Sequence, residues 1–289
     1  MRLIGRTGWS ATAAAVLLAA ACATDSHPDR ALTTSTTTPR RSTVPAADYT
    51  FPTEWAGNYT FQWSAADGID LAAPNAAVVR AFAESKRLAM SVGNTLSYPG
   101  YSAAVSAVDW LNTPDGGAYP VGAEHGDWQL RWSGTFLARI MRIQLQPKGF
   151  AAAYCLDYTN VADSIDGGST YRWNRPGQRG EPRRGWLIGF TAQDLADNIP
   201  DQPVTTSLTP GPPDRAPHYN VFEGLRVTRA WGPTPHDVDS ATLVEACTTW
   251  TRNNPQTNPV GIDSVHRRIP ADPPPDPTPP YPGWPGRHG

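Results

Sequence analysis

The sequence predicts an α+β domain whose N-terminal helices pack on a curved antiparallel sheet. Apolar residues recur at helical spacing over Asn75–Ser91, and from Trp128 onward the pattern changes to alternation. The links between alternating stretches are short, as at residues 147–149, and short links join antiparallel neighbours. Helices followed by a meander of strands are typical of the α+β class.

The composition is that of one folded domain with long polar ends. The chain has 289 residues, 39% of them hydrophobic, and its 30 prolines are densest at the C-terminus. We therefore place a single domain at residues 48–269. A net charge of −2, with no block of like charge, gives no reason to expect nucleic acid as a partner.

The first 21 residues have the organisation of an export signal. Arg2 and Arg6 precede an apolar run, Ala11–Ala20, that is too short to span a bilayer comfortably. The following Ala-Ala-Ala-Cys at residues 19–22 resembles the cleavage site of bacterial lipoproteins, although leucine is usual where Ala19 stands. The resemblance implies that Cys22 is acylated and that a lipid anchor holds the protein on the outer face of the cell membrane. Cleavage by an ordinary signal peptidase, which would give a secreted chain, is the alternative.

The cysteine count is consistent with that anchor. With Cys22 acylated, Cys155 and Cys247 remain, an even number in an exported chain, where disulfides persist. We predict a disulfide between Cys155 and Cys247. Two buried, unpaired cysteines are the alternative.

Two polar segments flank the predicted domain. Residues 22–47 form a Ser/Thr/Pro-rich stalk with almost nothing to bury, so we expect it to be disordered and to lift the domain from the membrane. Residues 270–289 form a Pro-rich tail in polyproline II conformation, which we expect to be unstructured. Docking of this tail into an aromatic-lined groove of a partner is the alternative.

Aromatic residues open the domain, and two helices follow. Five aromatic residues are expected to cover an edge or end of the sheet, and the last three of them alternate as in a short strand: Phe51, Trp55, Tyr59, Phe61 and Trp63. An exposed platform for carbohydrate is the alternative. The first helix covers Asn75–Ser91, with Asn75 as N-cap and a stop at Gly93, and the second runs from Ser102 to about Leu111.

The alternating stretches predict the strands of the sheet. They lie near residues 128–133, 137–145, 149–159, 186–190 and 219–231, with Gly134 linking the first two. Within Gly149–Thr159, Tyr154 and Tyr158 fall on the face under the helices, whereas Cys155 and Asp157 fall on the other face. Residues 163–184 and 191–218 are long loops, the first of them a hairpin. A short helix at 240–251 would be tied to the far face of the sheet through Cys247.

The order of these elements resembles a known family. Ala77–Met90 followed by Tyr98-Pro99-Gly100-Tyr101, and the strand at 153–158 followed by Asp166-Gly167-Gly168, resemble exported actinobacterial lipoproteins with an NTF2-like or cystatin-like cone domain. The resemblance covers roughly residues 75–231 and implies a curved sheet around an apolar cavity. Residues 191–218 and the chain after Trp231 depart from the pattern.

The sequence contains no familiar catalytic or cofactor signature. Gly-x-Ser-x-Gly, His-Glu-x-x-His, Cys-x-x-Cys and Gly-rich phosphate loops are all missing, and the six histidines are scattered. We therefore predict neither a metal nor a cofactor.

The expected function is that of a membrane-anchored lipoprotein of the cell envelope which binds an apolar ligand or an envelope protein without catalysis. The alternative is a cavity enzyme of the hydratase or isomerase type, in which burial raises the pKa of Asp109 or Asp157 for acid–base work. Alternation separates Asp157 from Tyr154 and Tyr158, which argues against that enzyme.

Overall fold

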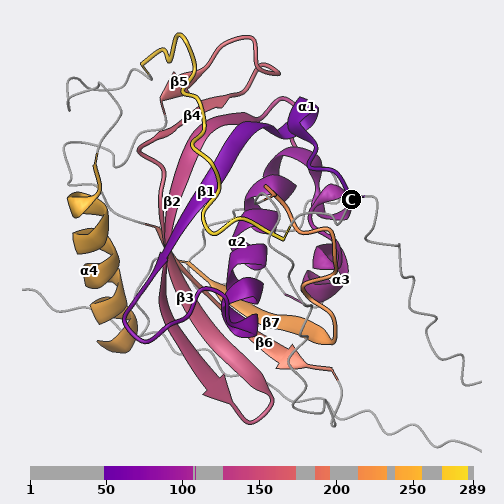
Figure 1. Ribbon diagram of the computed structural model, residues 1–289, viewed down its shortest axis with the longest axis vertical. Coiled ribbons are helices and arrows are strands. Elements are labelled where there is room, and N and C mark those ends of the chain that lie inside the picture. Colours follow the sequence, from indigo (N-terminus) through magenta and orange to yellow (C-terminus); the bar gives the residue numbers. More distant parts are fainter. Residues whose placement is uncertain are drawn as a thin grey trace, which may run out of the picture. The chain divides into compact units, whose positions relative to one another are not determined.

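A seven-stranded sheet with helices on both of its faces makes up the structure, a computed structural model (Figure 1). It describes residues 49–106, 108, 126–173, 186–195, 214–232, 238–255 and 269–285, which belong to the unit Thr43–Gly289. The predicted α+β class is confirmed. The signal at 1–21 with Cys22, the stalk at 22–47 and Asp109 lie outside the described residues.

The strands follow the order β5-β4-β2-β3-β6-β7, with β1 also paired to β2. All neighbours are antiparallel except β1 and β2, which run parallel. Parallel neighbours need a crossover connection, and the chain between these two strands includes helices α2 and α3. The bounds are β1 Gly57–Ala65, β2 Arg131–Gln146, β3 Gly149–Asp157, β4 Val161–Ser164, β5 Arg172–Trp173, β6 Trp186–Asp194 and β7 Leu225–Trp231.

The strand β2 is longer than the sequence predicts. We expected Gly134 to link two strands, but β2 runs through it and pairs with β4 at one end and with β3 at the other. Gly134 has a φ of 108°, and a Cβ there would lie 2.3 Å from the backbone oxygen of Asn160. The glycine is therefore required for a close approach inside the sheet rather than for a turn.

The helix α2 (Pro74–Val92) crosses the face of the sheet that carries most of the core (Figure 1). Its N-cap is Ala73, not Asn75, because Pro74 occupies the first helical position, where a missing N–H costs nothing. Gly93 ends it as predicted, at φ 80°, with its N–H bonded to the Ala89 oxygen. The shorter helices are α1 (Thr53–Ala56), the 3₁₀ turn η2 (Asn94–Leu96) and α3 (Tyr101–Val105).

Aromatic side chains from α2 and the sheet fill this core. Tyr59, Phe61 and Trp63 of β1 are all buried, so the carbohydrate platform is wrong for these residues. The ring of Phe82 from α2 stacks on that of Phe190 from β6 at 4.2 Å. The strand β1 lies at the sheet edge as expected, but it is a full member of the sheet rather than a cover.

The opposite face of the sheet carries helix α4 (Val238–Asn253), as Figure 1 shows. Cys155 of β3 and Cys247 of α4 form a disulfide with their Cα atoms 5.5 Å apart, which confirms the predicted pair. Leu243 and Trp250 of the helix pack around the bridge, whereas Tyr154 lies in the core on the helix α2 side. The predicted division of β3 into two faces is therefore confirmed.

The end of the chain is packed against the domain. We call residues 269–285 the C-terminal segment; it passes along β1 in Figure 1 and places Trp284 in the core. The expectation that this tail is unstructured is wrong for these residues. Its prolines lack the N–H that a central strand needs, but an edge position tolerates them, and one large aromatic side chain supplies the burial.

Candidate functional site

Helix α2 places three charged side chains in the interior. Arg80, Glu84 and Arg87 are 4%, 4% and 8% exposed. They follow one another at intervals of four and three residues, so they share one face of the helix. Burying a charge is costly unless it is paired or hydrogen bonded, so the partners of these groups define the candidate site.

The carboxyl group of Glu84 is the centre of this cluster. Its Oε1 accepts a hydrogen bond from the indole of Trp63 at 2.7 Å. Its Oε2 accepts from the hydroxyl of Tyr98 at 2.8 Å and from the indole of Trp284 at 2.7 Å. Burial raises the pKa of Glu84, while the charge of Arg80 and the three donors act in the opposite direction.

Arg80 completes the cluster from one turn earlier in the helix. Its guanidinium carbon lies 4.3 Å from the centre of the Trp284 ring, a cation–π contact. Its two terminal nitrogens donate to the backbone oxygens of Leu71 and Gly283, each at 3.4 Å. Burial lowers the pKa of Arg80, and the nearby Glu84 carboxylate raises it. The cluster therefore joins α2, β1, the Tyr98 turn and the C-terminal segment.

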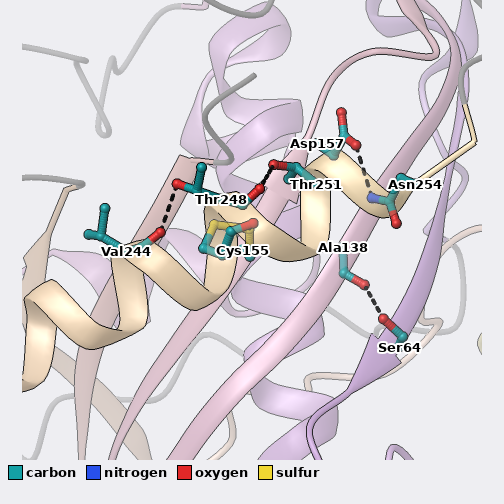
Figure 2. The surroundings of a disulfide bond; sticks show 9 residues. Ser64, Ala138, Cys155, Asp157, Val244, Thr248, Thr251 and Asn254 are labelled. Atoms are coloured by element: carbon teal, nitrogen blue, oxygen red, sulfur yellow. Dashed lines mark hydrogen bonds between the residues drawn. A yellow bond between two sulfur atoms is a disulfide. The ribbon is translucent and has the colours of Figure 1, made fainter. Parts of the chain in front are cut away.

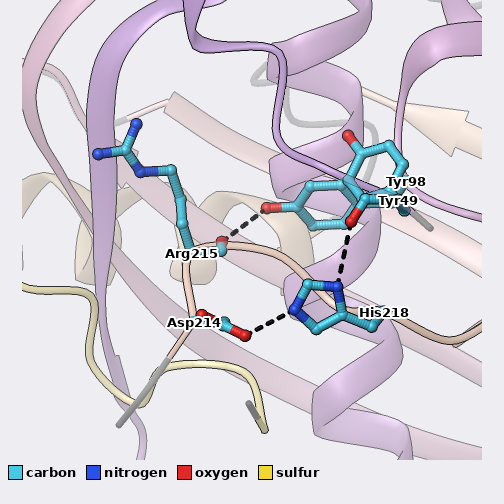
Figure 3. A network of polar contacts seen from close by, with 5 residues as sticks. All are labelled: Tyr49, Tyr98, Asp214, Arg215 and His218. Atoms are coloured by element: carbon cyan, nitrogen blue, oxygen red, sulfur yellow. Dashed lines mark hydrogen bonds and ion pairs between the residues drawn. The ribbon is translucent and has the colours of Figure 1, made fainter. Parts of the chain in front are cut away.

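A more exposed network continues from Tyr98 to the surface (Figure 3). The Tyr98 hydroxyl also lies 3.1 Å from the backbone oxygen of Arg215. Next to it, the His218 Nε2 is 2.6 Å from the Asp214 carboxylate, and the His218 Nδ1 is 3.1 Å from the backbone carbonyl oxygen of Tyr49. A carbonyl and a carboxylate both accept, so both ring nitrogens donate together only in the doubly protonated ring. The histidine therefore ties the start of the domain to the 214–218 stretch.

Arg87 lies apart from this cluster, among aromatic side chains. Its guanidinium carbon is 4.7 Å from the ring centres of Trp132 and Tyr158 and 5.2 Å from that of Phe136. One terminal nitrogen donates to the Tyr158 hydroxyl and the other contacts the Met90 sulfur at 3.2 Å. Among the described residues, the Arg87 Nε and the Trp132 indole nitrogen are buried without a hydrogen-bond partner. Among the described residues, three aromatic rings thus surround this cation.

The predicted carboxylate Asp157 has a structural position. Figure 2 shows it at the end of β3, where its Oδ2 accepts from the Asn254 amide at 2.9 Å. Its Oδ1 accepts from the Thr159 N–H at 2.9 Å. The structure therefore brings Asp157 to the α4 side with Cys155 and away from Tyr154, as the alternation of β3 predicts.

Replacing Asp157 by alanine is expected to lower the free energy of unfolding by about 1–3 kcal/mol, because the buried Thr159 N–H and the half-buried Asn254 amide lose their acceptor. Asp127→Ala is the matched control, since Asp127 makes the same turn contact, with the Gln129 N–H, at an exposed site. Its effect should stay within about 0.5 kcal/mol. Urea unfolding measures both. A variant of Asp157 with unchanged stability but lost ligand binding would instead place the residue in a binding site.

The Glu84 cluster was not predicted from the sequence. Its signal was the spacing of Arg80, Glu84 and Arg87, which share one face of α2 and cannot all be solvated beside a sheet. Trp284 had no local signal, because its burial depends on β1 and α2, about two hundred residues earlier.

The described part of the chain has neither a candidate metal site nor a helix suited to span a membrane. Among the described residues, no group of three or more His, Cys, Asp or Glu side chains could hold a metal ion. In the same part of the chain, no helix combines the length and apolarity needed to cross a membrane.

The fold and the site define a disulfide-linked α+β domain with a buried carboxyl cluster. No family model, curated protein or solved structure matches this chain significantly. The function must therefore be inferred from the chain's own residues.

Proposed function

We propose that this chain is an exported lipoprotein of the bacterial cell envelope, acylated at Cys22, whose domain binds an envelope protein or an apolar ligand without catalysis. The observation that carries the proposal is the Cys155–Cys247 disulfide. Disulfides persist outside the cytoplasm and are rare within it. Cys22 is then the one cysteine in the sequence left over, and its place at the end of a basic and apolar N-terminus supports acylation.

The proposed fold family is the NTF2-like or cystatin-like cone. Helices α2 and α3 and their core residues on one face of a mostly antiparallel sheet support it. Two features lie outside the region of resemblance to that family, residues 75–231. They are the parallel pairing of β1 with β2 and the presence of α4 on the far face of the sheet.

The hydrogen bonds of Asp157 and Glu84 favour binding over catalysis. A general acid or base needs an oxygen that a substrate can approach. Both oxygens of Asp157 and both oxygens of Glu84 accept hydrogen bonds from the protein itself. The raised pKa of Glu84 is the observation that favours the alternative, a cavity enzyme, but Trp284 covers that group.

Replacing Cys22 by serine is expected to move the protein from the membrane fraction to the soluble fraction, because the acyl chains attach to the Cys22 sulfur and amine. Mass analysis should find a diacylglyceryl adduct on Cys22 of the unaltered chain and none on the variant. The control is the Cys155→Ala/Cys247→Ala variant, which keeps Cys22 and should keep the adduct. A soluble mature chain that begins at unmodified Cys22 would contradict the proposal.

The binding role has its own test. The Cys22→Ser chain, purified from cells that export it, should carry the added mass of an apolar ligand or a partner protein in native mass spectrometry. A chain that carries neither contradicts the binding role, whatever the result for the lipid anchor.

A further inference from the structure

The C-terminal segment contacts β1 as a bound peptide contacts a sheet edge. The Trp63 N–H donates to the Tyr281 oxygen at 2.6 Å, and the Tyr281 N–H donates to the Phe61 oxygen at 3.1 Å. Gln62 and Tyr281 are thus register partners in a parallel bridge. Main-chain bonds to an exposed edge are the usual way in which an extended peptide joins a sheet.

One step upstream, threonines hold the backbone of Thr278. Its oxygen accepts from the Thr60 hydroxyl at 2.6 Å, and its N–H donates to the Thr135 hydroxyl oxygen at 2.9 Å. The segment otherwise consists largely of prolines, which have no N–H to satisfy and restrict the free chain to extended conformations. Little ordering entropy is therefore lost when such a segment binds.

Trp284 is the large side chain that is buried in this stretch. It is 3% exposed, whereas Tyr281 is 63% exposed. Its ring lies beneath the Arg80 guanidinium, its indole donates to Glu84, and its backbone exchanges two 2.8 Å hydrogen bonds with Asp214. One buried aromatic anchor, in a segment that otherwise contacts β1 through its backbone, is the pattern of a peptide ligand.

We propose that the edge of β1 and the Glu84 cluster together form a peptide-binding site for extended, proline-rich segments that carry a tryptophan. In the structure the chain's own C-terminal segment fills it, and in trans the same segment of a second copy of this chain does so. Every group that holds the segment belongs to the rest of the domain, so an identical segment fits identically. Residues 256–268 join Pro255 to the segment, and their extended length of about 45 Å is enough to reach a neighbouring molecule. The site does not depend on acylation of Cys22.

The first test asks whether the segment is replaceable. A protease site is placed within residues 256–268 of the full chain, and the cut protein is mixed with a labelled peptide of residues 269–285. The peptide should exchange into the cut protein, and a peptide with Trp284→Ala should bind at least about tenfold more weakly, as expected for a central aromatic anchor. Loss of the folded state on cutting, or equal binding of the two peptides, would overturn the site.

The second test identifies the source of the segment. Copies with Gln62→Cys are mixed with copies carrying Tyr281→Cys, both in a Cys22→Ser background, under mild oxidation. A disulfide-linked dimer forms between them only when the segment of one copy lies on the β1 of the other. Asp67→Cys, at an exposed position, replaces Gln62→Cys as the matched control. Yields no higher than this control would exclude the second copy as the source, even where the peptide test succeeds.

Discussion

Replacing Cys155 and Cys247 together by alanine is expected to lower the free energy of unfolding by about 4–5 kcal/mol. The bridge spans 92 residues, and a closed loop of that length removes about this much entropy from the unfolded chain. Alanine suits the site, because Ala153 and Leu187 form its apolar surroundings. The loss is the largest that we expect from any change outside the main core.

The same variant should also loosen α4 selectively. Besides the disulfide, α4 and the residue after it contact the sheet through side chains such as Leu243 and Trp250, through the Asn254–Asp157 bond and through an exposed Arg142–Asp239 ion pair. Exposed ion pairs contribute little. Amide hydrogen exchange should therefore rise more in α4 than in α2. Equal exchange in both helices, with an unchanged urea midpoint, would show that the bridge is dispensable.

Replacing Trp284 by alanine is expected to cost about 3–5 kcal/mol, the usual range for a fully buried large aromatic side chain. The change removes the ring below Arg80 and leaves the Glu84 Oε2 with the Tyr98 hydroxyl as its described donor. Trp284→Phe should cost less, because it keeps one six-membered aromatic ring and loses only the five-membered ring with its N–H. Urea unfolding, followed by tryptophan fluorescence or circular dichroism, measures the series.

Tyr281→Ala is the matched control within the same segment. Its side chain is exposed and its contacts with β1 are made by the backbone, so its effect should stay within about 0.5 kcal/mol. If Trp284→Ala and Tyr281→Ala had equal effects, the tryptophan would not hold the segment in place.

Local patterns in the sequence predicted the parts of the fold that local forces determine. The helical period gave α2 within a residue at each end, and alternation placed Cys155 and Tyr154 on opposite faces of β3. The disulfide followed from cysteine parity in an exported chain. Each of these depends on neighbouring residues or on a simple count.

Long-range contacts explain what the sequence did not reveal. The role of Gly134 depends on the approach of Asn160, and the parallel partner of β1 lies about seventy residues later. The burial of Trp284 depends on its contact with Glu84 of α2, which the periodicity of the sequence does not reveal. The Glu84 cluster joins four distant segments, so no window of sequence contains it.

The separation of Trp284 from Glu84, 200 residues along the chain, has a consequence for the order of folding during synthesis. The buried carboxylate of Glu84 obtains one of its three donors only when residue 284 has emerged. A core closed from both ends of the domain folds late, because its contacts span most of the chain. A nascent chain therefore keeps this core incomplete until the C-terminal segment has been made.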